Sequence, residues 1–233
     1  MSDNPSKLPA KSSAGDVAAF IEKLRTLPAA SAGGGRLIFA MDATASREPT
    51  WDRACQIQGE MFEATKSLGG LQIQLVYYRG FDECAASPWL ANADALTRRM
   101  TAVTCLGGQT QIGRVLAHAA KEAKRGRVNA AVFVGDCMEE DVDHLCRLAG
   151  ELGLMHVPVF VFHEGSDPVA RRAFKQIARL SGGAYCAFDS TSARMLADLL
   201  RAVAVYAAGG ARALAQLPDK TAALIAAQIA HRP

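Results

Sequence analysis

The stretch Arg36-Leu-Ile-Phe-Ala-Met-Asp42-Ala-Thr-Ala-Ser46 joins an uninterrupted apolar run to a short polar segment. A continuous apolar run of this length is typical of a strand that is buried on both faces, as the strands of parallel sheets are. Asp42 ends the run, and Thr44 and Ser46 follow it with only alanines between them. The stretch therefore predicts a buried strand that leads into a loop of three oxygen-bearing side chains with little bulk around them.

Further apolar runs alternate with helical patterns along the rest of the chain. The runs that predict strands cover residues 71–78, 129–135, 157–163 and 184–188, with a short edge strand within 81–90. Helical spacing of apolar residues covers about 16–27, 51–68, 93–103, 111–125, 141–154, 168–180, 192–207 and 219–230. This alternation predicts an α/β fold: a Rossmann-like, doubly wound, mostly parallel six-stranded sheet with helices on both faces. We expect a flexible tail and a helix over 1–35, the α/β domain over 36–208 and a helical extension over 209–233.

Composition excludes several classes of function. The net charge of the 233-residue chain is only +3, and no basic patch is interleaved with aromatic residues, so we expect no nucleic-acid partner. The chain start lacks an apolar signal segment, and no apolar run approaches the roughly 20 residues of a membrane span. We therefore expect a cytoplasmic protein with no membrane partner, whose six cysteines are free thiols. Zinc binding by Cys137, His144 and Cys146 is disfavoured, because their spacing matches no standard zinc pattern.

Oxygen-bearing side chains stand at three predicted loops. In open α/β sheets, ligands bind beyond the carboxyl ends of the strands. Asp42, Thr44 and Ser46 follow the first strand, Asp136 follows the strand over 129–135, and Thr110 lies after two glycines just before a helix. Such a set suits a hard cation, since magnesium takes about six oxygens at roughly 2.0–2.1 Å. The simpler alternative is that these side chains only cap helices and turns.

Four segments together resemble a known family, the von Willebrand factor A domains. Asp42-Ala-Thr-Ala-Ser46 resembles the family's Asp-x-Ser-x-Ser motif, and Gly107-Gly-Gln-Thr110 resembles its glycine-rich segment with a threonine ligand. Val132-Phe-Val-Gly-Asp136 resembles the strand that ends in its second aspartate, and Ser181-Gly-Gly-Ala-Tyr185 resembles the Gly-Gly-x-Tyr segment before its last strand. The order and spacing agree from about residue 36 to 208.

The resemblance implies a metal-ion-dependent adhesion site that holds Mg²⁺ or Mn²⁺. Thr44 and Ser46 would supply hydroxyl ligands, Thr110 a direct or water-bridged one, and Asp42 and Asp136 would bind directly or through water. It also implies a binding module, not an enzyme, that engages an Asp or Glu of a protein partner through the metal. Bacterial proteins that resemble this family often act as adaptor or assembly subunits beside ATPases or chaperones, which suggests such a partner here.

Two departures from the family pattern adjoin these ligands. Thr44 stands where a serine is usual, and Cys137 follows Asp136 where the family usually has glycine. The acidic run over 138–143 is interpreted as ordinary partners of a helix dipole, the alternative being a rim that raises cation affinity. Arg47 is expected at the surface, where it could orient an acidic ligand.

Two other functions remain as alternatives. The first is a structural subunit with a vestigial metal site. The second is a magnesium-dependent phosphatase of the haloacid dehalogenase type, whose nucleophilic aspartate also ends a strand. That chemistry needs a second acid two residues later as the proton donor, and Thr44 occupies this position. An ordinary hydroxyl does not donate a proton efficiently near neutral pH, so the enzyme alternative ranks below a binding module.

Overall fold

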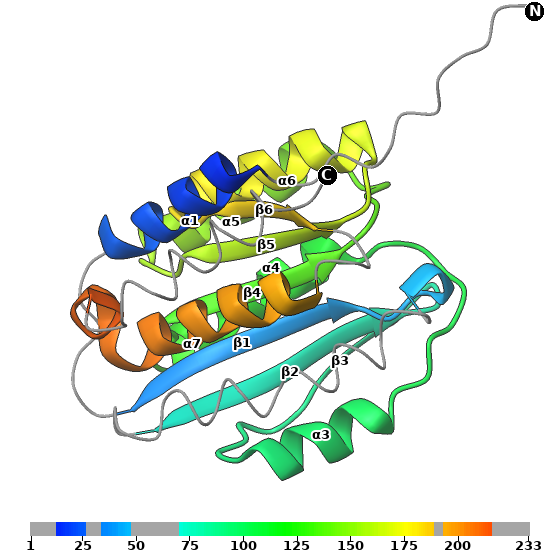
Figure 1. Ribbon diagram of the computed structural model, residues 1–233. Coiled ribbons are helices and arrows are strands. Elements are labelled where there is room, and N and C mark those ends of the chain that lie inside the picture. Colours follow the sequence, from blue (N-terminus) through cyan, green and yellow to red (C-terminus); the bar gives the residue numbers. More distant parts are fainter. Residues whose placement is uncertain (1–12, 27–33, 48–69, 189–192, 216–233) are drawn as a thin grey trace, which may run out of the picture.

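A twisted six-stranded sheet lies between two layers of helices (Figure 1) in the computed structural model, which describes residues 13–26, 34–47, 70–188 and 193–215. The strands are β1 (Gly35–Asp42), β2 (Leu71–Arg79), β3 (Glu83–Ala86), β4 (Ala130–Gly135), β5 (Val159–Glu164) and β6 (Tyr185–Phe188). The helices are α1 (Ala14–Thr26), α3 (Ala93–Thr101), α4 (Ile112–Arg125), α5 (Val142–Leu154), α6 (Pro168–Ser181) and α7 (Ala193–Ala215), with a short 3₁₀ helix η1 (Ala45–Arg47).

The strand order is β3-β2-β1-β4-β5-β6, and only the edge strand β3 runs antiparallel to its neighbour. The predicted fold class, a mostly parallel six-stranded sheet covered on both faces, is therefore confirmed. Helix α7 continues beyond the predicted end at 207, although Gly210 leaves the helical backbone with a φ of 69°. The helices predicted over 51–68 and 219–230 fall largely or wholly outside the described residues.

Each face of the sheet has its own hydrophobic core, because successive side chains of a strand point to opposite faces. In β1, Leu37, Phe39 and Met41 pack under α1, α3 and α7, whereas Ile38 and Ala40 pack under α4, α5 and α6. Figure 1 shows α1 and α7 side by side in front of the sheet and α4 and α5 behind it. This double burial explains why β1 reads as an unbroken apolar run.

The strand order places the candidate ligands at one edge. After β1 the chain first adds β2 on one side and later adds β4 on the other, so β1 and β4 flank the point at which the order reverses. Their parallel register pairs Met41 with Val134, which brings Asp42 and Asp136 to neighbouring strand ends. Within the described residues, the helices are too short or too polar to cross a lipid bilayer.

Candidate metal centre

Asp42 is the most buried acid of the site, with no exposed surface. Its Oδ1 accepts a hydrogen bond from the backbone N–H of Thr44 at 2.7 Å, and its Oδ2 accepts one from the Tyr78 hydroxyl at 2.9 Å. Tyr78 stands opposite Asp42 in the β1–β2 register and is itself fully buried. Burial raises the pKa of Asp42, the two donors lower it in part, and the charge of Asp136 raises it further.

Thr44 and Ser46 turn back toward Asp42 directly after β1. The Thr44 and Ser46 hydroxyl oxygens lie 3.2 Å apart, and the chain closes into η1 through a hydrogen bond from the Arg47 N–H to the Thr44 carbonyl. Thr44 is buried, whereas Ser46 is exposed. The loop therefore presents two hydroxyl oxygens beside a carboxylate, as the sequence predicts.

Asp136 follows the last residue of β4. Its backbone is held in place by a hydrogen bond with His163 of β5. The His163 ring is fully buried, and Nε2 lies 3.0 Å from the Asp136 carbonyl oxygen while Nδ1 lies 2.9 Å from the Tyr185 hydroxyl. Burial lowers the pKa of His163, so the ring is neutral near pH 7. Because a carbonyl only accepts, Nε2–H donates to Asp136, and Nδ1 accepts from Tyr185.

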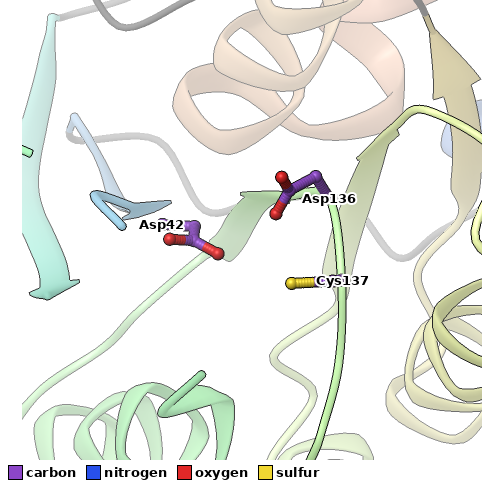
Figure 2. Close-up of side chains that lie close together, drawn as sticks. All are labelled: Asp42, Asp136 and Cys137. Atoms are coloured by element: carbon purple, nitrogen blue, oxygen red, sulfur yellow. The ribbon is translucent and has the colours of Figure 1, made fainter. Parts of the chain in front are cut away.

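Asp42, Asp136 and Cys137 converge at the edge of the sheet. One ligand atom from each, two carboxylate oxygens and the Sγ, lie within 4.8 Å of one another. Figure 2 shows the two carboxylates facing each other from the ends of β1 and β4, with the sulfur directed to the same side as the Asp136 carboxylate. Burial and the charges of Asp136 and Asp42 raise the pKa of the half-buried Cys137 thiol to about 12.

Thr110 reaches the site through the loop that follows β4. Its hydroxyl accepts a hydrogen bond from the Glu139 N–H, and its own N–H donates to the Glu139 carboxylate, both at 3.2 Å. Thr110 is buried and lies one residue before Gln111, the N-cap of α4. The structure thus ties Thr110 to the segment that carries Asp136, as expected for side chains of one site.

The acidic run over 138–143 binds the N-termini of two helices, α5 and α4. The sequence predicts only the interaction with α5. Asp141 caps α5 by accepting a hydrogen bond from the His144 N–H at 2.7 Å, in line with the expected dipole partnership. Glu140 instead accepts hydrogen bonds from the Ile112 and Gly113 N–H groups of α4. Glu139 and Glu140 therefore close the N-terminus of a different helix, the one that Thr110 precedes.

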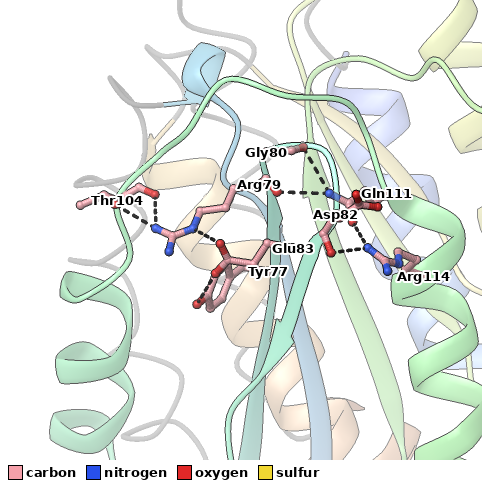
Figure 3. A network of polar contacts seen from close by, with 8 residues as sticks. All are labelled: Tyr77, Arg79, Gly80, Asp82, Glu83, Thr104, Gln111 and Arg114. Carbon is pink, nitrogen blue, oxygen red and sulfur yellow. Dashed lines mark hydrogen bonds and ion pairs between the residues drawn. The ribbon is translucent and has the colours of Figure 1, made fainter.

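The turn between β2 and β3 holds the glycine-rich segment in place. Gln109 N–H donates to the Gly80 carbonyl at 3.1 Å, and the Gln111 side chain donates to the Arg79 and Gly80 carbonyls at 3.2 and 3.3 Å. Figure 3 shows the contacts of Gln111 with this turn and the hydrogen bonds from Arg79 to Thr104. Gly108 packs directly on the turn, since a Cβ there would lie 1.9 Å from the Gly80 carbonyl oxygen.

Arg47 corrects a sequence-based expectation, because it is buried and not a surface residue. Only 2% of it is exposed, and its guanidinium forms an ion pair with Glu164 at the end of β5. Burial lowers the pKa of Arg47, and the nearby charges of Asp136 and Asp42 offset part of this effect. The buried positive charge of Arg47 therefore offsets part of the negative charge of the site. Arg47 is not placed to contact an acidic partner at the surface.

The donor set fits a divalent cation. Asp136 Oδ1 is buried and lacks a hydrogen-bond partner among the described residues, which is costly for a carboxylate oxygen unless a cation or water satisfies it. A carboxylate oxygen of Asp136 lies within 4.8 Å of one of Asp42, and the loop that carries the Thr44 and Ser46 hydroxyls is bonded to Asp42. Carboxylates and hydroxyls are the ligands that magnesium and manganese prefer.

No protein-family model matches the sequence, and no curated protein matches it significantly. Solved structures do match it. Proximal thread matrix protein 1 from the mussel byssus aligns with a TM-score of 0.59 at 15% identity, over 74% of this chain and 46% of that one. The SpRpn10 von Willebrand factor A domain aligns with a TM-score of 0.55 at 15% identity, over 71% and 93%. The chain thus spans less than half of the mussel protein.

Two of the similar structures contain a metal. The mussel protein has also been solved with zinc in its metal-ion-dependent adhesion site motif. The manganese-loaded TRAP protein of Plasmodium vivax aligns with a TM-score of 0.54 at 13% identity, over 75% of this chain and 76% of that one. At these identities the likeness establishes the fold, which is that of a von Willebrand factor A domain.

Proposed function

Given its von Willebrand factor A fold, we propose that this chain is a metal-dependent protein-binding module, an adaptor or assembly subunit and not an enzyme. The observation that carries the proposal is the convergence of Asp42 and Asp136 at the switch point of the sheet, within 4.8 Å and with one carboxylate oxygen buried and unbonded among the described residues. Similar structures with zinc and manganese at this fold support a divalent cation here.

The proposed ligands for Mg²⁺ or Mn²⁺ are the five residues that the sequence singles out. They are Asp42, Thr44, Ser46, Thr110 and Asp136. A cation held by two carboxylates and neutral hydroxyls is formally uncharged as a complex and retains affinity for one more anionic oxygen. We propose that an Asp or Glu of a protein partner supplies that oxygen, the partner being an ATPase or chaperone of the class that the resemblance implies.

The surface beside the site supports a protein partner. Phe81, in the β2–β3 turn, is 70% exposed, and Leu106, which leads into the glycine-rich segment, is 54% exposed. The two positions are linked, since the Gly80 N–H donates to the Leu106 carbonyl. Large apolar side chains exposed beside a polar site are typical of protein interfaces. The acids Glu139 and Glu140 repel an acidic partner less than their number suggests, because they bind the N-terminal region of α4.

The test is affinity capture from the native lysate with the full chain, in parallel with magnesium and with a chelator. We expect one partner to be retained with magnesium, lost with chelator and with Asp42→Ala, and bound more weakly by Thr110→Ala. Replacing the partner's candidate acids one at a time should then identify the residue that contacts the metal. A complex that forms equally well in chelator and with Asp42→Ala would contradict the proposal and favour a structural subunit with a vestigial site.

A further inference from the structure

The metal site contains a sulfur that an all-oxygen ligand set does not include. Cys137 directly follows Asp136, and its Sγ belongs to the group of three ligand atoms that lie within 4.8 Å of one another. The bend after β4 turns the sulfur to the same side as the Asp136 carboxylate (Figure 2). Its neighbours in this group are carboxylates, so the sulfur lies close to the position of a cation held between Asp42 and Asp136.

The spacing is within side-chain reach of a metal complex. Zinc binds carboxylate oxygen at about 2.0–2.2 Å and thiolate sulfur at about 2.3 Å, so an oxygen and a sulfur on one tetrahedral ion are about 3.6 Å apart. The group of three already spans no more than 4.8 Å. Side-chain rotations that move these atoms by about 1 Å would bring all three onto one tetrahedral ion.

We propose that Cys137 is a direct ligand of the metal site and makes the site selective for zinc over magnesium. This inference rests on the proposed function, because it assigns the ion that the same site takes. Magnesium binds oxygen ligands and gains nothing from a thiol, whereas zinc binds carboxylate and thiolate together. Asp42, Asp136 and Cys137 supply three protein ligands, which leaves a fourth tetrahedral position for a hydroxyl, water or a partner oxygen. On zinc binding, the Cys137 thiol releases its proton to the solvent and the thiolate bonds to the ion.

Cys137 differs from an ordinary core thiol in its exposure and in its neighbours. The side chain is only half-buried, and the charged groups around it are the carboxylates of Asp42, Asp136 and Glu139. Cys146, on α5, is also half-buried and free, but it does not belong to the ligand group. It therefore serves as a matched control for thiol chemistry unrelated to the site.

The experiment uses the full metal-free chain in a phosphine reductant and titrates it with Co²⁺, Zn²⁺ and Mg²⁺. A cobalt–thiolate bond gives a charge-transfer absorption in the near ultraviolet, which oxygen ligands do not produce. We expect this band in the wild type and in Cys146→Ser and its loss in Cys137→Ser. We also expect Cys137→Ser to lower zinc affinity by about tenfold or more while magnesium affinity stays nearly unchanged.

The outcomes separate this inference from the proposed function. If Cys137→Ser retains the cobalt band and the zinc affinity of the wild type, Cys137 is no ligand. The proposed function still stands in that case, provided that Asp42→Asn abolishes magnesium binding. If Asp42→Asn leaves the binding of all three ions unchanged, the proposed site itself is wrong. A band that Cys146→Ser removes and Cys137→Ser retains would place the thiol ligand on α5 and overturn the inference.

Discussion

At the scale of single residues, the account depends on two acids that face each other with little access to water. Burial and the charge of Asp136 raise the pKa of Asp42 above its ordinary value of 3.8. A divalent cation would offset this cost, whereas in the metal-free protein the ionised pair opposes folding. The two acids and the three hydroxyls could be predicted from the sequence, because each stands at the end of an apolar run or just before a helix.

Asp42→Asn should abolish the stabilisation that metal provides and should raise the stability of the metal-free protein at neutral pH. Cation at about a hundred times its Kd stabilises a folded site by about 2.7 kcal/mol, and each kcal/mol raises Tm by about 2–4 °C at this chain length. Asparagine can still accept the Thr44 N–H but carries no charge toward Asp136. Thermal unfolding with and without metal measures both effects, and a full magnesium shift in the variant would contradict the assignment.

The pH dependence follows from the direction of the Asp42 shift. Its pKa is higher in the folded than in the unfolded protein. Its contribution to stability is therefore complete below about pH 3.8 and is lost as the pH rises through the raised folded value. In chelator, Asp42→Asn should gain stability over the wild type progressively across this window, as followed by urea unfolding at several pH values. A difference that does not change with pH would show that the folded and unfolded pKa values are the same.

The burial of Arg47 leaves no signal in the sequence, because its partner, Glu164, ends a different strand. Removing one member of a buried ion pair leaves the other charged and desolvated, at a cost of about 3–5 kcal/mol. We expect Arg47→Met to destabilise the metal-free chain by about this amount, measured by urea unfolding. Arg47→Met combined with Glu164→Leu should recover much of the loss. Equal stability of Arg47→Met and wild type would mean that the pair does not form.

At the scale of elements, the loops around the site decide how the hydroxyls are placed. The strands are predictable because β1, β4 and β5 each contain a continuous apolar run, and a short edge strand is expected within 81–90, where β3 lies. The hydrogen bonds between the loops cannot be predicted in this way. The sequence predicts that Glu140 interacts with the dipole of α5, the next helix along the chain, whereas its carboxylate binds the N-terminus of α4. Such long-range hydrogen bonds leave no periodic signal in the sequence.

The glycine-rich segment provides a matched pair of variants for this scale. A Cβ at Gly108 would overlap the Gly80 backbone, whereas a Cβ at Gly107 would meet no atom within 4 Å. Gly108→Ala should shift the loop that carries Thr110 and weaken metal binding by about tenfold or more, as loss of support around metal ligands does. Gly107→Ala should bind like the wild type in calorimetry. Equal affinities of the two variants would show that the turn does not position Thr110.

At the scale of the whole molecule, the strand order makes the site, since it places β1 beside β4 although the chain forms β2 and β3 between them. The sequence predicted the number and direction of the strands and the edge at which ligands gather. It left the order of the strands open, because apolar runs do not say which strand pairs with which. The family resemblance supplied the missing link between Asp42 and Asp136.

The exposed side chains of Phe81 and Leu106 form the proposed contact surface for the partner. Exposed apolar side chains at the centre of an interface each contribute about 2 kcal/mol when they are hot spots. Phe81→Ser and Leu106→Ser should therefore weaken the captured complex by tenfold or more and leave metal affinity unchanged. Val169, which is 45% exposed at the start of α6, provides a control, and Val169→Ser should have no effect. Weakening by the control alone would place the interface on α6.

The central claim is that one divalent cation binds between the ends of β1 and β4. The most direct measurement follows the spectrum of free Mn²⁺ by electron paramagnetic resonance while the metal-free chain is titrated. We expect one Mn²⁺ bound per chain in the wild type and none in Asp42→Asn or Asp136→Asn at the same concentrations, with magnesium displacing the bound ion. Unchanged Mn²⁺ binding in both variants, or no binding by the wild type at millimolar Mn²⁺, would contradict the account.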